Sequence, residues 1–285
     1  MKKLTMLLFT LALVFSCIGC GSKEESANDA ANVEAETDVE DETDAEVEDA
    51  DVAEPEAADE TQEDAAEAKS EGVMTYDEYV AADLESEVVV ETYVQAKQSW
   101  WEDKATLYTQ DQDGAYFVYN VACSQEDYDK LTPGTKIKVT GYKSEWSGEV
   151  EIVDGTFEIE DGNYVAEAED VTGLLGSDEL INHQNEFVTF KGMTVEAAGQ
   201  DDDGNDVAFL YNWDGSGQDG DDLYFNVSLD GTTYTFTVES YLCDNTTDVY
   251  SAVKALNIGD KIDMEGFLYW YEGVNPHITS VTAAN

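Results

Sequence analysis

The sequence predicts a mostly β protein in which two similar domains follow a long acidic segment. Three observations predict this organisation. Residues 73–285 carry alternating runs rich in Val, Ile, Tyr, Phe, Trp and Thr, broken by Asp-Gly turns, which is the pattern of β-strands. The second half of this region repeats the first half. Residues 23–72 are almost wholly Glu, Asp, Ala, Val, Thr and Ser, a composition that cannot supply a packed core.

The N-terminus has the pattern of an export signal. Lys2 and Lys3 supply positive charge, and residues 4–15 form an apolar run that is too short to span a bilayer core of about 30 Å. We therefore predict that residues 1–19 are a signal peptide that is removed.

The cysteines that follow indicate a lipid anchor. The run Cys17-Ile-Gly-Cys20-Gly-Ser resembles the lipobox of bacterial lipoproteins. The resemblance implies that Cys20 is the lipid-modified first residue of the mature chain, held at the extracytoplasmic face of the cell membrane without crossing it. Cys17 stands where Leu is usual and is a second acceptor, although the Gly-Ser-Lys after Cys20 favours Cys20. The pair also spells C-x-x-C, a redox or zinc pattern, which the signal context outweighs.

Residues 20–72 are predicted to be a disordered linker. From Lys23 to Gly72 the chain has 22 acidic residues, two lysines and no aromatic side chain. Such a segment cannot bury enough apolar surface to offset its ordering entropy. A neutral flexible chain of that length spans about 40 Å, and charge repulsion extends it further. We interpret it as a spacer; the alternative is that it captures cations.

Charge also limits the expected partners of the folded part. Residues 73–285 hold 43 acidic residues and 9 lysines, and the chain has no arginine. Nucleic-acid binding takes most of its affinity from Lys and Arg at phosphates, so we expect no nucleic acid as a partner. Anionic lipid is disfavoured for the same reason, which leaves the lipid anchor as the only membrane contact. Glycans, peptides, basic proteins and metal ions fit this charge.

An internal repeat divides the folded part. Residues 134–142, with the pattern Gly-x-Lys-Ile and a later Gly141, match residues 259–267 with Gly266. The same elements precede this motif in both halves: a helix start, a long first strand, a hairpin, a strand that ends at cysteine, and a short helix. In the two halves these are Thr75 and Ser177, 87–101 and 186–197, Asp113-Gly114 and Asp230-Gly231, Cys123 and Cys243, and 125–131 and 247–256.

This element order resembles the OB-fold, a five-stranded Greek-key barrel. The resemblance implies two tandem five-stranded OB-fold-like barrels in residues 73–165 and 166–285, each with a short helix between its third and fourth strands. It does not name a function, because this fold serves oligonucleotide, oligosaccharide, protein and purely structural roles.

Outward-facing aromatic residues are the predicted binding surface, because aromatic faces stack on sugar rings or bases. Strand alternation places Trp270 in the core of the second barrel and its neighbours outward. The candidates are Phe267, Tyr269 and Tyr271, with Tyr142 and Trp146 at corresponding places in the first repeat. The alternative is that these rings cover the junction between the barrels or pack under a loop.

Trp100 and Trp101 lie at the turn between the first two strands, a loop that OB-folds often use for ligands. One of two adjacent side chains usually points inward, so we expect one tryptophan to anchor the core and the other to be available to a ligand.

The insertion 199–222 has eight aspartates and no lysine. Closely spaced carboxylates suit Ca²⁺, and the candidate ligands are Asp201, Asp203, Asp206, Asp219 and Asp221. The spacing does not complete an EF-hand loop, and the alternative is a solvated loop. No other cofactor is expected.

Cys123 and Cys243 are expected to be buried free thiols, with a disulfide between the barrels as the alternative. Residues 73–285 contain no G-x-S-x-G, H-E-x-x-H or P-loop run, and we predict no catalytic residue. The sequence therefore favours a non-enzymatic, lipid-anchored module that binds a cell-envelope glycan or protein. The alternatives are a structural or divalent-cation-binding surface lipoprotein and, third, a hydrolase.

Overall fold

The computed structural model describes residues 69–201 and 203–284. The predicted signal peptide, Cys20 and residues 20–68 of the predicted linker lie outside these residues. Within the described residues, no helix has the length and apolar character that crossing a membrane requires.

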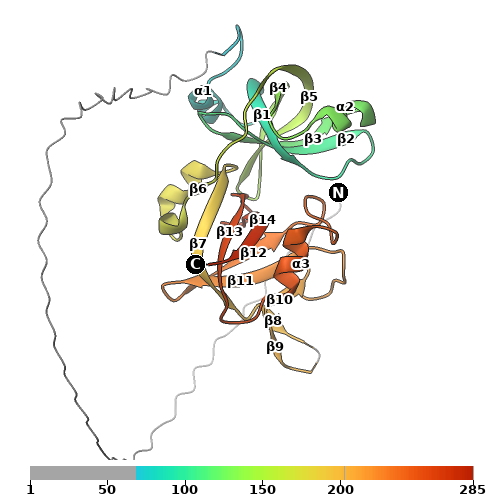
Figure 1. The fold of residues 1–285 in the computed structure, drawn as a ribbon. Helices are drawn as coiled ribbons and strands as arrows, with labels where there is room; N and C mark the ends of the chain where they lie inside the picture. Colours follow the sequence, from blue (N-terminus) through green and yellow to red (C-terminus); the bar gives the residue numbers. More distant parts are fainter. Residues whose placement is uncertain (1–68, 202, 285) are drawn as a thin grey trace, which may run out of the picture. The chain divides into compact units, whose positions relative to one another are not determined.

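The first barrel is a closed ring of five strands in the order β1-β2-β3-β5-β4 (Figure 1). The parallel pairing of β3 with β5 closes it, and all other neighbours are antiparallel. A helix, α1, precedes the barrel, and α2 lies between its third and fourth strands. The bounds are α1 Tyr76–Ala81, β1 Glu87–Lys97, β2 Lys104–Gln110, β3 Ala115–Ala122, α2 Gln125–Lys130, β4 Thr135–Trp146 and β5 Glu149–Asn163.

The second barrel repeats this topology. Its sheet order β11-β12-β14-β13-β7 is closed by an additional pairing of β11 with β7, and the short strands β6 and β10 extend its edges. Helix α3 again lies between the third and fourth strands of the ring. The bounds are β6 Glu169–Asp170, β7 Phe187–Glu196, β10 Phe209–Tyr211, β11 Leu223–Leu229, β12 Thr232–Val238, α3 Asp248–Lys254, β13 Lys261–Phe267 and β14 His277–Ala283.

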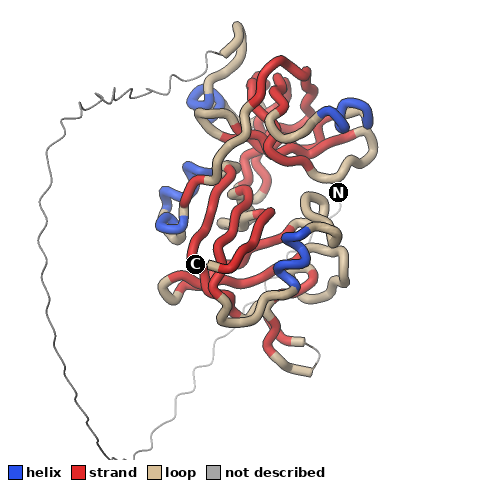
Figure 2. Tube along the Cα trace, viewed as in Figure 1, coloured by secondary structure: helices blue, strands red, loops and turns tan. Residues whose placement is uncertain are grey.

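The predicted fold class is confirmed: two OB-fold-like barrels follow one another, and strands dominate both (Figure 2). The helix start predicted at Thr75 is confirmed: Thr75 is the N-cap of α1 and forms a capping box with Glu78. The helix expected after Ser177 is a 3₁₀ helix, Asp178–His183, with Ser177 as its N-cap. The insertion contains β8 Gly199–Gln200, β9 Asp206–Val207 and β10.

The repeated glycines have the same structural role in both barrels. Gly141 lies within a register shift of β4 against β5, and Gly266 follows a register shift of β13 against β14. A Cβ on Gly141 would lie 2.6 Å from Ile152, and a Cβ on Gly266 would lie 2.2 Å from the backbone oxygen of His277. Because no Cβ fits at a β-bulge packed this closely, the repeat requires glycine at both places.

The first strand of the first barrel ends earlier than the predicted 87–101. β1 ends at Lys97, and Trp101 forms only an isolated bridge with Lys104. The turn that follows has two residues in the left-handed region, Glu102 at φ 49° and Asp103 at φ 59°. Before this reversal the two adjacent tryptophans differ in burial: Trp100 is half-buried and Trp101 is exposed.

Candidate ligand-binding cleft

The two barrels contact each other through a small aromatic cluster. Tyr108 and Phe117 of the first barrel and Phe267 of the second are buried together, and the Tyr108 and Phe267 rings stack 4.6 Å apart. Phe267 is only 3% exposed. The prediction that Phe267 faces a ligand is therefore wrong. Phe267 lies on the outer surface of the second barrel, and the first barrel covers it there.

Two buried polar groups cross the same junction. The Tyr108 hydroxyl lies 2.6 Å from Nδ1 of His277, and burial lowers the pKa of this imidazole to about 3, so the ring is neutral. A carboxylate oxygen of Glu149 accepts the backbone N–H of Trp270 at 2.9 Å and the amide of Gln184 at 3.2 Å. Burial raises the pKa of Glu149 to about 8 despite these hydrogen bonds.

A cavity of about 1020 Å³ lies beside this junction and takes side chains from both barrels. We call it the inter-barrel cleft and define it by its six exposed aromatic residues: Trp101, Tyr119, Trp146, Trp213, Tyr241 and Tyr271. Backbone hydrogen bonds join the barrels at two places on its lining. Ser99 N–H donates to the Tyr241 carbonyl, and Glu272 N–H donates to the Ser147 carbonyl, each at 2.7 Å.

Every exposed tryptophan of the described residues lines this cleft. Trp101, Trp146 and Trp213 are 68%, 59% and 76% exposed. Large rings are costly to leave in water, and gathered apolar exposure of this kind marks interaction sites. Turns present all three: Trp101 precedes the left-handed pair after β1, Trp146 ends β4, and Trp213 follows the left-handed Asn212.

The first-barrel wall is the usual ligand face of an OB-fold, which consists of strands two and three with the loops after strands one and four. Trp101 lies in the first of these loops and Trp146 at the second. Phe117 and Tyr119 lie on the third strand with their rings stacked 6.3 Å apart. The cleft therefore lies on the usual ligand face of the first barrel. The second barrel covers part of that face.

The second-barrel wall is acidic. Asp222, Glu239 and Glu272 line it, whereas Lys104 is the one lysine among the lining residues. Glu239 follows β12 and accepts the backbone N–H groups of Tyr241 at 3.1 Å and Leu242 at 2.8 Å. Burial and the nearby Asp222 carboxylate outweigh these hydrogen bonds and raise the pKa of Glu239 to about 7.

The other predicted aromatic residues have different surroundings. Trp100 is half-buried, and its indole N–H donates to the Cys123 carbonyl at 3.0 Å, so it is the anchor of the pair. Tyr269 is half-buried, stacks on His277 at 4.2 Å and lines the cleft. Tyr142 is exposed but does not line the cleft. Trp270 packs against the core of the second barrel.

Sequence reasoning missed Trp213, Tyr119, Tyr241 and the lining carboxylates. Trp213 lies in the insertion that was interpreted through its aspartates, and a lone tryptophan in so polar a loop is the signal that points to it. The same loop spells Gly215-Ser-Gly-Gln-Asp-Gly220, the spacing of a dinucleotide fingerprint. It leads from β10 into β11, whereas that fingerprint opens a helix.

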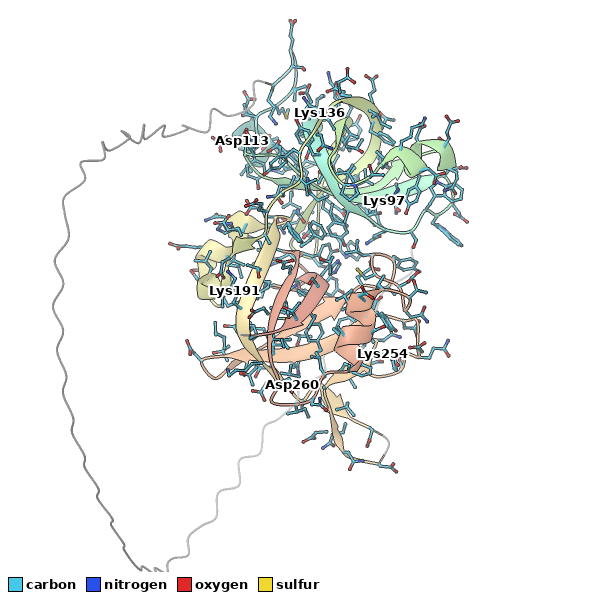
Figure 3. All side chains as sticks on the ribbon, in the orientation of Figure 1. Lys97, Asp113, Lys136, Lys191, Lys254 and Asp260 are labelled. Carbon is cyan, nitrogen blue, oxygen red and sulfur yellow. The ribbon has the colours of Figure 1, made fainter. Side chains whose placement is uncertain are left out.

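The predicted calcium ligands do not converge. Asp201 accepts the backbone N–H groups of Asp203 and Asn205 within one turn. Asp219 pairs with Lys254. Lys254 is the last residue of α3 (Figure 3). Asp221 accepts the Gln218 N–H, and Asp206 accepts the Gln200 amide.

Among residues 69–201 and 203–284, one group of three side chains lies close enough together to hold a metal ion: Glu169, His183 and Glu186. None of the predicted calcium ligands belongs to this group. Nδ1 of His183 lies 2.8 Å from a Glu186 oxygen and 3.6 Å from a Glu169 oxygen.

Cys123 and Cys243 are both free and buried, as expected. Burial raises the pKa of the Cys123 thiol to about 11 and that of Cys243 to about 12, so neither is a nucleophile at neutral pH.

No protein-family model and no curated protein matches the chain. Solved structures with a low-level likeness do exist. A murine DNA-binding protein bound to double-stranded DNA has 13% identity and a TM-score of 0.31, covering 69% of this chain and 96% of that chain. The Ifi202 HINa domain in complex with a 20-base-pair DNA has 11% identity and a TM-score of 0.32, covering 70% and 100%.

A replication protein A heterotrimer bound to single-stranded DNA has 11% identity and a TM-score of 0.30, covering 70% of this chain and 49% of that chain. These three structures contain bound DNA. The expectation that nucleic acid is excluded as a partner is therefore corrected: it rested on the summed charge of the chain, whereas an interface depends on local charge and shape. The chain is similar to DNA-binding structures at the level of the fold.

Proposed function

We propose that the protein is a non-enzymatic glycan-binding module that a lipid on Cys20 holds at the outer face of the cell membrane. The observation that carries the proposal is the inter-barrel cleft, in which all three exposed tryptophans of the described residues line one cavity. Sugar rings have apolar C–H faces that pack on aromatic faces, and exposed tryptophans supply such surfaces.

The size of the cleft supports an oligosaccharide. Pockets for drug-sized ligands measure roughly 300 to 1000 Å³, and this cleft of about 1020 Å³ has room for several sugar rings. Its polar groups also fit, because carboxylates and the side chains of Gln98, Asn120 and Asn275 can exchange hydrogen bonds with hydroxyls.

Two of the lining carboxylates, Glu239 and Asp222, have backbone partners that fix their positions in the cleft. Both oxygens of Glu239 accept backbone N–H groups, and Asp222 accepts the Ser240 N–H at 2.8 Å. These two carboxylates therefore hold the turn after β12 in place.

A binding screen with tryptophan variants tests the proposal. Soluble cell-envelope oligosaccharides are titrated into the protein, and Trp101→Ala, Trp146→Ala and Trp213→Ala are compared with Tyr142→Ala, an exposed aromatic control outside the cleft. We expect each tryptophan variant to weaken binding about tenfold, while Tyr142→Ala binds as the parent does. Equal binding by all variants would place the ligand elsewhere, and selective binding of single-stranded DNA oligonucleotides would replace the glycan.

The anchor has a separate test. Cells expressing the chain are labelled with a radioactive fatty acid, and Cys20→Ala is compared with Cys17→Ala. We expect the label to disappear only in Cys20→Ala. Retained label in that variant would refute the lipid anchor and leave the cleft proposal standing.

A further inference from the structure

The charge of the inter-barrel cleft narrows the class of its ligand. Asp222, Glu239 and Glu272 all line the second-barrel wall, and Lys104 is the only cationic lining residue. Among residues 69–201 and 203–284, none of these three carboxylates forms a salt bridge. His277 lines the same cavity but is neutral.

Ionised carboxylates that lie close together in a partly desolvated cavity repel one another. Asp222 and Glu239 are close enough for the Asp222 charge to raise the Glu239 pKa, in addition to the larger effect of burial. A cation placed between them relieves both effects, because an opposite charge favours the ionised carboxylate. The cleft therefore binds a cation more favourably than a neutral group of the same shape.

The aromatic wall favours the same charge. The faces of Trp and Tyr rings carry negative potential and attract a cation that lies within about 6 Å of the ring centre. The carboxylates accept hydrogen bonds, which a primary ammonium can donate and a fully alkylated one cannot. A sugar ring that has apolar C–H faces and bears a primary ammonium group combines both requirements.

We infer that the glycan bound in the inter-barrel cleft carries free amino groups, as a de-N-acetylated amino-sugar chain does. The inference rests on the glycan-binding function proposed above. The sugar rings pack on Trp101, Trp146 and Trp213, and the ammonium groups lie toward Asp222, Glu239 and Glu272.

Two oligosaccharides of equal length test it directly. A β-1,4-linked glucosamine hexamer with free amino groups and its fully N-acetylated counterpart are titrated by calorimetry into the purified protein at pH 6 and physiological salt. We expect the amino form to bind about tenfold more tightly, a difference of about 1.4 kcal/mol. Glu272→Gln should bring the two affinities closer together without weakening the acetylated form. Glu239→Gln should do so to a smaller extent, because Glu239 is mostly protonated at pH 6 in the free protein.

A matched control separates the cleft from the general acidity of the chain. Asp230→Asn removes one negative charge from the β11–β12 turn, outside the cleft, at a left-handed position that Asn tolerates. Glu272 makes no side-chain hydrogen bond among the described residues, so Glu272→Gln tests the inference even if Glu239→Gln disturbs its turn.

Each outcome is decisive. Equal affinity for both hexamers would overturn the inference and leave glycan binding intact, and equal effects of Asp230→Asn and the cleft variants would overturn it as nonspecific attraction. If neither hexamer binds but a neutral envelope oligosaccharide does, the amino-sugar inference fails and the proposed glycan-binding function stands. If no saccharide binds, the proposed function fails with it.

Discussion

Glu149 makes the stability of the barrel junction depend on pH. Its side chain is fully buried, and its Oε1 has no hydrogen-bond partner, as is also true of the Oδ1 of the neighbouring Asn185. Burial raises the pKa of Glu149 from 4.5 to about 8, so the carboxyl is mostly protonated in the folded protein at pH 7.

The sign of the effect follows from proton linkage. The folded state binds this proton more tightly than the unfolded state, so stability falls as the pH rises from about 4.5 to about 8 and is constant above. One pKa unit corresponds to 1.36 kcal/mol, so the penalty is about 3 kcal/mol at pH 7 and about 5 kcal/mol above pH 8. Glutamine mimics the protonated acid, and Glu149→Gln should remove this penalty.

The assay is urea unfolding at pH 5, 7 and 8.5, with exposed Glu158→Gln on β5 as the control. Relative to the parent, Glu149→Gln should gain about 4 kcal/mol in unfolding free energy between pH 5 and pH 8.5. Because Glu239 also titrates in this range, only the difference between variant and parent is used. A difference that stays constant within about 1 kcal/mol over this range would show that Glu149 does not titrate as described.

Three further predictions concern the barrels. Lys143→Met should cost about 2 to 3 kcal/mol in unfolding free energy, because the buried ammonium donates to three carbonyls after and within α1. Gly266→Ala should cost about 3 kcal/mol or more by thermal unfolding, since its Cβ would meet a backbone oxygen at 2.2 Å. Peptide mapping after thiol labelling at pH 8 should find Cys123 and Cys243 unmodified in the folded protein and modified in urea.

Controls make these results interpretable. Gly173→Ala places a Cβ where nothing lies within 4 Å and should leave the melting temperature nearly unchanged. Equal losses at both glycines would contradict the bulge argument. An unaffected Lys143→Met variant would mean that water replaces the ammonium, and rapid labelling of either thiol in the folded protein would contradict its burial.

The fold was predictable because the sequence repeats itself. Alternation within 134–142 and 259–267 defined a strand in each half, and Gly141 and Gly266 are required at equivalent bulges. The end of β1 at Lys97 was not predictable, because the two tryptophans that suggested a strand up to Trp101 lie in the segment before the reversal at Glu102 and Asp103.

The cleft was predictable only in part. Alternation along a strand distinguishes the core from the surface of one barrel, but it does not show which part of that surface another barrel covers. Trp101 and Trp146 were found from loop positions and from the repeat. Phe267 was assigned correctly to the outside of its own barrel and lies against the other barrel. Trp213 faces the cleft only through the folding of the insertion against β11, which no periodicity encodes.

The calcium prediction shows a similar limit. Asp201 and Asp219 are close in sequence, but one is bonded within its own turn and the other pairs with Lys254. Carboxylates that are close in sequence form a metal site only where the backbone turns them toward a common centre. The backbone of residues 199–222 does not do this for the predicted ligands. The acidic residues that matter for the proposed ligand come from three separate loops instead.

Tryptophan footprinting tests the central claim most directly. The protein is oxidised briefly with N-bromosuccinimide, with and without a saturating envelope oligosaccharide, and each tryptophan is quantified by mass spectrometry. Trp101, Trp146 and Trp213 should be modified in the free protein and protected together by the ligand, while the half-buried Trp100 and Trp270 react slowly in both states. Bound oligosaccharide that leaves all three exposed tryptophans fully reactive would contradict the inter-barrel cleft as the binding site.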